Sequence, residues 1–371
     1  MGQQVRMAVF ALIACAAFAQ NGPSSQGGTA LKTQFVEVQP DVKLEVLDWG
    51  GAGRNLVLLA GLGSTAHVFD SLGPKLAAHY HVIGITRRGF GQSSAPQTGY
   101  DPKRLGDDVV AVLDALHITD PVLAGHSIAG EELSAISTYH PGRAAALIYL
   151  DAGGTFALYN PKHGDYAPAL AQLKDDLSAL QKNLFDDSLI SKTLTDMALF
   201  QSNLAELRGE VEGATPPSPK ASDLASISAF QSYMKGYFGG IIPESEVRQD
   251  FRIGEDGRVG EWLGHGYPNQ SVMLEEERFH SIETPLLAIF SYPSAPYPSQ
   301  TSDPAKLAAS RAAETSREEA QIAIFREQPH AKVIVIPNAT HYIFLSREEE
   351  VISQISDFVN SLPATVKQSQ K

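Results

Sequence analysis

The chain has 371 residues, of which 43% are hydrophobic and 19% are charged, and its formal net charge is −13. This composition is typical of soluble globular proteins, and the length is sufficient for one large domain or two smaller ones. The acidic balance and the lack of clustered Lys and Arg residues argue against nucleic acid as a partner.

The N-terminal segment has the pattern of a secretory signal peptide. Arg6 provides a short positive region, residues 7–18 are almost wholly apolar, and Ala17-Phe18-Ala19 is a small-residue cleavage pattern. We therefore expect residues 1–19 to be removed on export and residues 20–34 to form a disordered linker. The mature protein would then be periplasmic or secreted.

Cys15 is the only cysteine of the chain. It closes the run 12–15 (LIAC), which resembles a bacterial lipoprotein box, so a lipid anchor at Cys15 is the alternative to plain secretion. We favour plain secretion because the apolar run continues past Cys15 to the cleavage pattern. This run is too short to span a bilayer comfortably, so no transmembrane helix is expected. Without Cys15 the mature chain has no thiol for a disulfide, a nucleophile or a metal site.

Strands and helices alternate in the first part of the chain. The continuous apolar run Asn55–Leu59 is typical of a strand buried on both faces. Apolar residues at helical spacing predict a helix over 104–116. In all, strands are expected over 35–38, 43–48, 55–59, 81–85, 122–124 and 146–150, and helices over 66–79, 104–116 and 128–140. This alternation predicts βαβ units and a mostly parallel sheet.

The pattern changes over residues 154–282, where helical segments dominate. We expect helices over 168–184 and 187–207, an interruption at the proline-rich stretch 213–222, and a loop or short hairpin over 254–266. These residues are expected to form a helical cap inserted after the sixth strand. The alternation then resumes, with strands over 285–290 and 333–336 and helices over 304–326 and 348–362. The core would comprise residues 35–153 and 283–365.

The most informative motif is Gly125-His126-Ser127-Ile128-Ala129. An apolar strand leads into it and an amphipathic helix follows at once, which is the strand–turn–helix context of a nucleophile elbow. Small residues on either side of Ser127 allow a sharp turn that exposes the serine hydroxyl. The same turn directs the backbone N–H of Ile128, at the helix start, toward a developing oxyanion.

With these residues in view, the chain resembles the α/β-hydrolase superfamily, in its branch of capped, esterase-like serine hydrolases. Residues 58–64 (LLAGLGS) resemble the family's oxyanion segment, with Ala60 in place of the usual histidine. Residues 87–93 (RRGFGQS) resemble a family loop that mainly shapes the fold. Ala129 replaces the second glycine of the usual elbow. The resemblance implies an eight-stranded, mostly parallel sheet flanked by helices, and a second oxyanion donor in the N–H of Leu62.

A serine nucleophile needs a base, because its hydroxyl is almost fully protonated at neutral pH. His341 lies between the last expected strand and the last expected helix, where the superfamily carries this base. The acid that orients the imidazole has two candidates. We favour Asp151, at the end of the sixth strand, where some relatives carry it, and the alternative is Asp303. Asp303 also has the pattern of a helix N-cap before Pro304.

Other acidic pairs are expected to be structural. Glu131 and Glu132 occupy the first turn of the helix after Ser127, where acids complement the helix dipole. Asp107 and Asp108 are expected on a solvated helix start. The sequence has neither a phosphate-binding glycine loop nor a metal-ligand spacing, so we expect no cofactor and no metal.

The sequence predicts a serine hydrolase, of carboxylesterase type, that acts on a small apolar ester or related acyl compound through an acyl-enzyme. A carbon–carbon bond hydrolase or a cofactor-free haloperoxidase-like enzyme using the same triad is the second hypothesis. A hydrolase-like binding protein with little turnover is the third. Epoxide hydrolase and haloalkane dehalogenase chemistry is disfavoured, because relatives that perform it carry aspartate at the position of Ser127.

Overall fold

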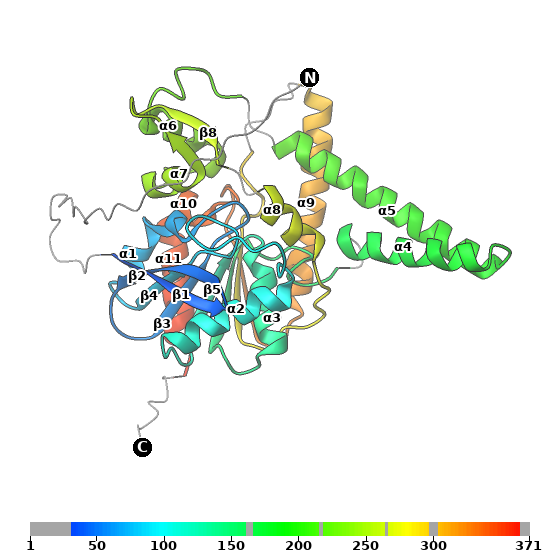
Figure 1. Ribbon diagram of the computed structural model, residues 1–371, viewed down its shortest axis with the longest axis horizontal. Helices are drawn as coiled ribbons and strands as arrows, with labels where there is room; N and C mark the ends of the chain where they lie inside the picture. Colours follow the sequence, from blue (N-terminus) through cyan, green and yellow to red (C-terminus); the bar gives the residue numbers. More distant parts are fainter. Residues whose placement is uncertain (1–30, 161–165, 215–217, 264–265, 297–302, 364–371) are drawn as a thin grey trace, which may run out of the picture.

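The computed structural model describes residues 31–363 except 161–165, 215–217, 264–265 and 297–302 (Figure 1). The expected signal peptide, Cys15 and most of the expected linker lie outside the described residues.

The core is an eight-stranded sheet with the strand order β1-β2-β4-β3-β5-β6-β9-β10. The strands are β1 (Lys32–Gln39), β2 (Val42–Gly50), β3 (Asn55–Leu59), β4 (His81–Ile85), β5 (Val122–His126), β6 (Ala146–Leu150), β9 (Leu286–Phe290) and β10 (Ala331–Val335). β2 runs antiparallel to both β1 and β4, and the other neighbouring pairs are parallel. The predicted mostly parallel, eight-stranded sheet is confirmed. β1 begins at Lys32, so the sheet includes the last residues of the segment expected as a linker.

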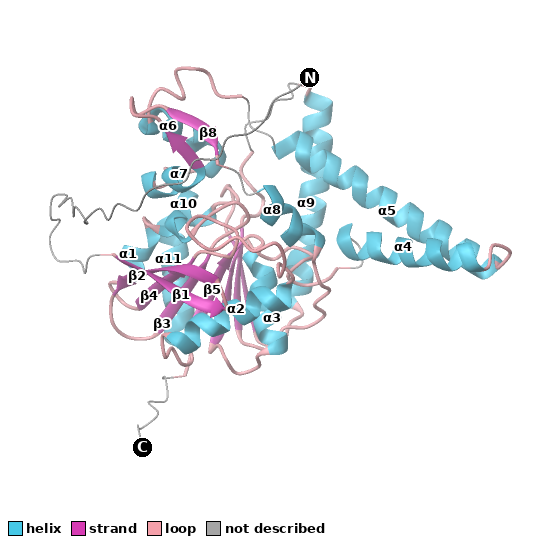
Figure 2. Cartoon of the chain, viewed as in Figure 1, coloured by secondary structure: helices cyan, strands magenta, loops and turns pink. Residues whose placement is uncertain are grey.

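Helices cover both faces of the sheet (Figure 2). They are α1 (Leu72–Leu76), α2 (Pro102–Ala115), α3 (Ala129–Tyr139), α9 (Pro304–Arg326), α10 (Ile343–Ser346) and α11 (Glu348–Ser361). Alternate residues of each central strand face opposite layers. In β3, Val57 and Leu59 pack in the apolar cluster shared with α2, α3 and α9. Leu56 and Leu58 pack in the cluster shared with α1, α10 and α11.

The prediction of a single helix over residues 66–79 is wrong. The structure has a 3-10 helix, η1 (Ala66–Phe69), and then α1, which starts at Leu72. Pro74 explains the break, because it has no N–H to continue a helix from the preceding turn. In the first turn of α1 that missing donor costs nothing. The predicted helix over 104–116 is present as α2, which starts two residues earlier than expected, at Pro102. The Asp101 side chain caps this helix by accepting the Arg104 N–H at 2.9 Å.

Between β6 and β9 the described residues form helices and one small hairpin. These elements are α4 (Tyr166–Lys182), α5 (Asp187–Ala214), α6 (Ile227–Phe238), α7 (Glu244–Asp250), β7 (Phe251–Ile253), β8 (Val259–Trp262) and α8 (Gly266–Leu274). α6, α7 and the hairpin have an apolar cluster of their own, around Phe230, Val247 and Val259. In Figure 1, α4 and α5 extend away from the sheet beside α9. Over the described ranges, no helix is both long and apolar enough to cross a membrane.

Candidate active site

Ser127 occupies a sharp turn between β5 and α3. β5 ends at His126 and α3 begins at Ala129, so only Ser127 and Ile128 lie between them. Ser127 has φ of 54°, in the left-handed region that non-glycine residues rarely adopt. A Cβ at Gly125 would lie 3.0 Å from the Ala129 Cβ, which explains why the residues two positions before and after the serine are small. Such strain is typical of functional turns and holds the hydroxyl beyond the carboxyl end of the strand.

Hydrogen bonds join Ser127 to His341 and His341 to Asp151. The Ser127 Oγ lies 2.8 Å from His341 Nε2, and His341 Nδ1 lies 2.8 Å from Asp151 Oδ2. Because the Asp151 carboxylate only accepts hydrogen bonds, Nδ1 carries the proton and Nε2 is left to accept the serine proton.

The Asp151 carboxylate is itself fixed. The Ser291 N–H donates to Asp151 Oδ1 at 2.8 Å, and the Ser291 hydroxyl donates to Oδ2 at 2.8 Å. Ser291 directly follows β9, and Asp151 directly follows β6, its neighbour in the sheet. The structure thus brings Ser127, His341 and Asp151 together. Asp303 instead caps α9, where its Oδ1 accepts the N–H groups of Ala305 and Lys306 at 2.9 and 3.4 Å.

His126 packs beneath the loop that carries His341. Its ring centroid lies 4.7 Å from that of His341, and its Nε2 donates to the His341 carbonyl oxygen at 3.0 Å. Complete burial holds the pKa of His126 well below its ordinary value, so the ring is neutral. A neutral ring with Nε2–H supports the backbone of His341 without placing a second positive charge beside it.

The two expected oxyanion donors belong to Ile128, which directly follows Ser127 in the chain, and to Leu62. Ile128 is the N-cap residue of α3, so its N–H has no partner within that helix and points out of the positive end of the helix dipole. Leu62 lies in the loop after β3. Its side chain packs in one apolar cluster with Ile128 and with Val272 of α8. A Cβ at Gly61 would lie 3.1 Å from the Ser127 Cβ, so the loop runs directly against the serine.

α7 also contacts the loop after β3. The buried Glu246 carboxylate accepts the Thr65 N–H at 2.9 Å and the Thr65 hydroxyl. Burial raises the pKa of Glu246 to about 7. One turn further on, burial and the Glu246 charge raise the pKa of Asp250 to about 9. A segment of the insertion is therefore joined to the loop that carries Leu62 through the buried carboxyl group of Glu246.

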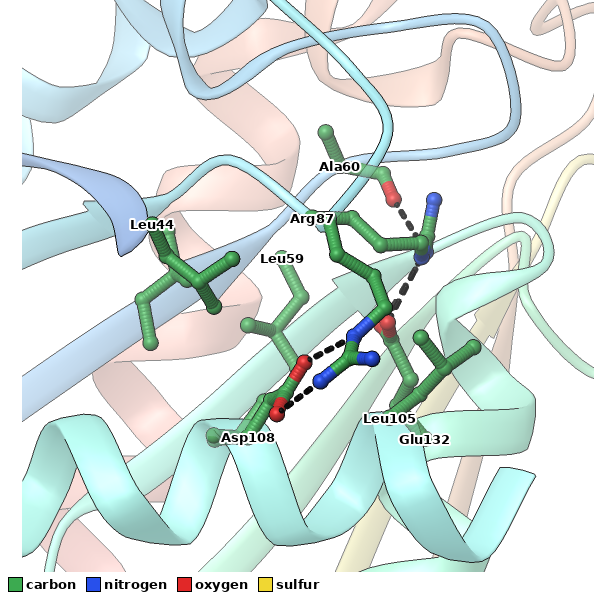
Figure 3. Close-up of a pocket in the computed structure, with 10 residues that line it drawn as sticks. Leu44, Leu59, Ala60, Arg87, Leu105, Asp108 and Glu132 are labelled. Atoms are coloured by element: carbon green, nitrogen blue, oxygen red, sulfur yellow. Dashed lines mark hydrogen bonds and ion pairs between the residues drawn. The ribbon is translucent and has the colours of Figure 1, made fainter. Parts of the chain in front are cut away.

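The expectation that Asp108 lies on a solvated helix start is wrong, whereas Glu131 and Glu132 occupy the first turn of α3 as expected. All three are buried, and burial raises the pKa of both glutamates. Glu132 forms an ion pair with Arg87 (Figure 3). Asp108 forms one with Arg88. The two consecutive arginines close to the end of a buried strand could have indicated these ion pairs, because a buried guanidinium requires a buried carboxylate nearby.

Two further acids lie close to the Asp151–His341 pair. Glu314 and Glu318 of α9 both accept the Ser294 hydroxyl, at 3.4 and 3.0 Å. Burial, followed by the nearby Asp151 charge, raises the pKa of Glu318 to about 8. Neither was expected from the sequence, since both occur within an ordinary charged helix. Within the described ranges, no group of three or more His, Cys, Asp or Glu side chains could hold a metal ion.

A family model described as "Alpha/beta hydrolase family" matches residues 56–354. A putative non-heme haloperoxidase of Mycobacterium phage D29 is 31% identical over 165 residues, which are 44% of this chain and 59% of the phage protein. Bifunctional epoxide hydrolase 2 of Rattus norvegicus is 25% identical over 225 residues, or 55% of this chain and 39% of the rat protein. The chain thus spans about half the length of the curated relatives it matches.

Solved structures with the same fold include E-2-(acetamidomethylene)succinate hydrolase and an esterase from Exiguobacterium antarcticum. Each superposes on this chain with a TM-score of 0.55, and each alignment includes 89% of this chain and all of the other protein. The sequence identity is 19% for the first and 18% for the second. At this level of identity the likeness shows the fold alone.

Proposed function

The chain belongs to the alpha/beta hydrolase family, and from this membership we propose that it is a serine hydrolase that cleaves a carboxylic ester or related acyl bond. The observation that carries the proposal is the hydrogen-bonded series Ser127–His341–Asp151, with 2.8 Å at each step. In the proposed reaction, the Ser127 Oγ attacks the ester carbonyl while His341 Nε2 takes its proton.

The Asp151 carboxylate stabilises the resulting imidazolium. Collapse of the tetrahedral intermediate expels the alcohol, which takes the proton from His341 Nε2. His341 Nε2 then takes a proton from water, which attacks the acyl-enzyme; the acyl–Oγ bond breaks, the carboxylic acid is released, and the proton returns from His341 to Ser127 Oγ. The N–H groups of Leu62 and Ile128 would hold the oxyanion in both steps.

Asp151 is the proposed acid, and Asp303 is not. The hydrogen bond from His341 to Asp151 favours this assignment, whereas the Asp303 carboxylate caps α9. The two donors of Ser291 further support Asp151, because they keep its carboxylate oriented toward the imidazole.

We further propose that residues 154–282 act as a cap that selects the substrate. The packing of Val272 and Met273 of α8 with Leu62 and Ile128 supports this, since it brings apolar side chains of the insertion next to the nucleophile. Such surroundings favour a small apolar acyl group over a charged one.

The proposal is tested by labelling the purified protein with a fluorophosphonate probe and by assaying short and long p-nitrophenyl esters. Ser127→Ala is expected to abolish labelling and to lower kcat by about 10⁴-fold or more. Ser232 is an exposed serine of α6, and Ser232→Ala is the matched control. It should leave labelling and kcat unchanged. Labelling that persists in Ser127→Ala would contradict the assignment of the nucleophile.

A second candidate follows from the similar phage protein, which is named as a putative haloperoxidase. Hydrogen peroxide in place of water would attack the same acyl-enzyme and release a peracid, which oxidises halide. Bromination of a dye in acetate and peroxide, abolished in Ser127→Ala, would support this activity. Ester hydrolysis without bromination would exclude it.

Export forms a separate part of the proposal and rests on the pattern of residues 1–19. Fractionation of a bacterial host that expresses the full chain, with mass determination of the product, tests it. Cleavage after Ala19 is expected, and a lipidated Cys15 would favour the anchored alternative.

A further inference from the structure

Arg87 joins the two segments that carry the proposed oxyanion donors. Its guanidinium binds the Glu132 carboxylate through Nε at 2.6 Å and Nη2 at 3.0 Å. The same group donates to the carbonyl oxygens of Ala60, at 2.9 Å from Nη2, and of Gly61, at 3.3 Å from Nη1. In Figure 3 the side chain of Arg87 lies between Glu132 on α3 and the carbonyl of Ala60. Side chains of both ion-pair partners are about 95% buried, at 4% and 5% exposure.

The contact with Gly61 bears directly on the Leu62 N–H. The carbonyl of Gly61 and the N–H of Leu62 belong to one planar peptide unit, and in a trans peptide they point in opposite directions. A donor that holds the Gly61 oxygen therefore also fixes where the Leu62 N–H points. Ser64 donates its N–H to the same oxygen at 3.3 Å, so the carbonyl has two donors.

The other end of the ion pair fixes the second donor. Glu132 lies in the first turns of α3, the helix whose N-cap residue is Ile128. A bidentate guanidinium–carboxylate pair is directional and, when buried, cannot exchange its partners with water. One side chain therefore sets the spacing between the loop that carries Leu62 and the helix start that carries Ile128.

We propose that Arg87, paired with Glu132, is a positioning residue for the oxyanion site, which aligns the Leu62 and Ile128 N–H groups on one oxygen atom. This inference rests on the proposed serine hydrolase function. Its effect is specific to the tetrahedral intermediate, because the ground-state carbonyl oxygen needs the two donors less than the oxyanion does.

Arg88 provides a matched control. It is also buried and also forms a bidentate ion pair, in this case with Asp108 of α2, through Nε and Nη2 at 2.5 and 2.7 Å. Its other acceptors are the carbonyl oxygen of Thr98 and the side chain of Gln39, both away from the loop after β3. Loss of Arg88 should cost stability but should leave the oxyanion site intact.

The test compares Arg87→Lys with Arg88→Lys at a temperature where both remain folded by circular dichroism. Arg87→Lys keeps the charge beside Glu132 but loses the planar fork that reaches two carbonyls. We expect kcat for a p-nitrophenyl ester to fall about 10- to 100-fold with KM changed by less than about 3-fold. Inhibition by a boronic acid, whose tetrahedral adduct places an oxygen at this site, should weaken by a similar factor. Arg88→Lys should keep kcat and boronate affinity.

The proposal would be overturned if kcat fell equally in Arg87→Lys and Arg88→Lys, or if Arg87→Lys changed KM alone. If Arg87→Lys fails to fold, Glu132→Gln is used instead, since it keeps an oxygen acceptor and the side-chain volume. A crystal structure of the variant gives a readout that does not depend on activity. We expect the Gly61–Leu62 peptide to be rotated or to occupy two orientations. An unchanged peptide would contradict the positioning role, whereas wild-type protein without Ser127-dependent hydrolysis would contradict the proposed function instead.

Discussion

Replacement of Asp151 by asparagine should switch the tautomer of His341. The backbone N–H of Ser291 can only donate, and it lies 2.8 Å from Asp151 Oδ1. In Asp151→Asn the side-chain carbonyl must therefore take the Oδ1 position, which turns the NH₂ group toward His341 Nδ1. The imidazole then accepts at Nδ1 and carries its proton on Nε2, which faces the Ser127 Oγ and can no longer take the serine proton.

The expected loss in kcat is about 10⁴-fold, the size known for this substitution in a serine protease triad, and it corresponds to about 5 kcal/mol of activation free energy. Initial rates on a p-nitrophenyl ester, with folding checked by circular dichroism, measure it. Asp303→Asn is the matched control: asparagine caps helices as well as aspartate does, so both kcat and the melting temperature should stay at wild-type values. The reasoning is refuted if Asp151→Asn keeps more than a tenth of the activity, or if Asp303→Asn loses as much.

Three further outcomes are expected. Ser291→Ala removes one of the two donors that orient Asp151, so kcat should fall about 10-fold while the melting temperature changes little, as rates and thermal scans will show. Gly130→Ala would bring a Cβ within 2.0 Å of the Ala152 carbonyl oxygen, so it should lower the free energy of unfolding by about 2 kcal/mol or more in urea titrations. The pKa of Asp250 is raised to about 9 on folding, so its contribution to stability is full below about pH 4 and is lost as the pH rises to 9. The melting temperature should therefore fall from pH 5 to pH 9, and Asp250→Asn should flatten this slope; an equal slope in the variant would show that other groups cause it.

Local patterns were sufficient to predict the sheet and the elbow. Asn55–Leu59 is apolar at every position except the first, and the structure buries it between two helical layers as expected. The order of strand, small residues and helix around Ser127 is likewise contained in nine consecutive residues. These features depend on short-range sterics and on burial, both of which are visible in a short window.

Features that depend on distant partners were not predictable in the same way. From the local sequence, Glu132 is predicted to be an ordinary helix-start residue. Its burial and its ion pair depend on Arg87, which lies 45 positions earlier in the chain. The choice between Asp151 and Asp303 was open for the same reason, since each follows a pattern that an ordinary turn or cap also shows. The helices α6, α7 and α8 were not predicted, and their packing involves distant partners: α6 and α7 pack with the β7–β8 hairpin, and α8 packs with Leu62 and Ile128.

β6 and β9 are direct neighbours in the sheet, with Leu150 opposite Ile289. Because the two strands are parallel, the chain leaves the core at the carboxyl end of β6 and returns to it at the amino end of β9, the adjacent strand. The lengths and contents of the intervening helices can change over evolutionary time, or be exchanged by grafting, without moving Asp151 or Ser291. Since the free energy of closing such an excursion grows only slowly with its length, this junction is the natural place to graft a new specificity onto the same catalytic frame.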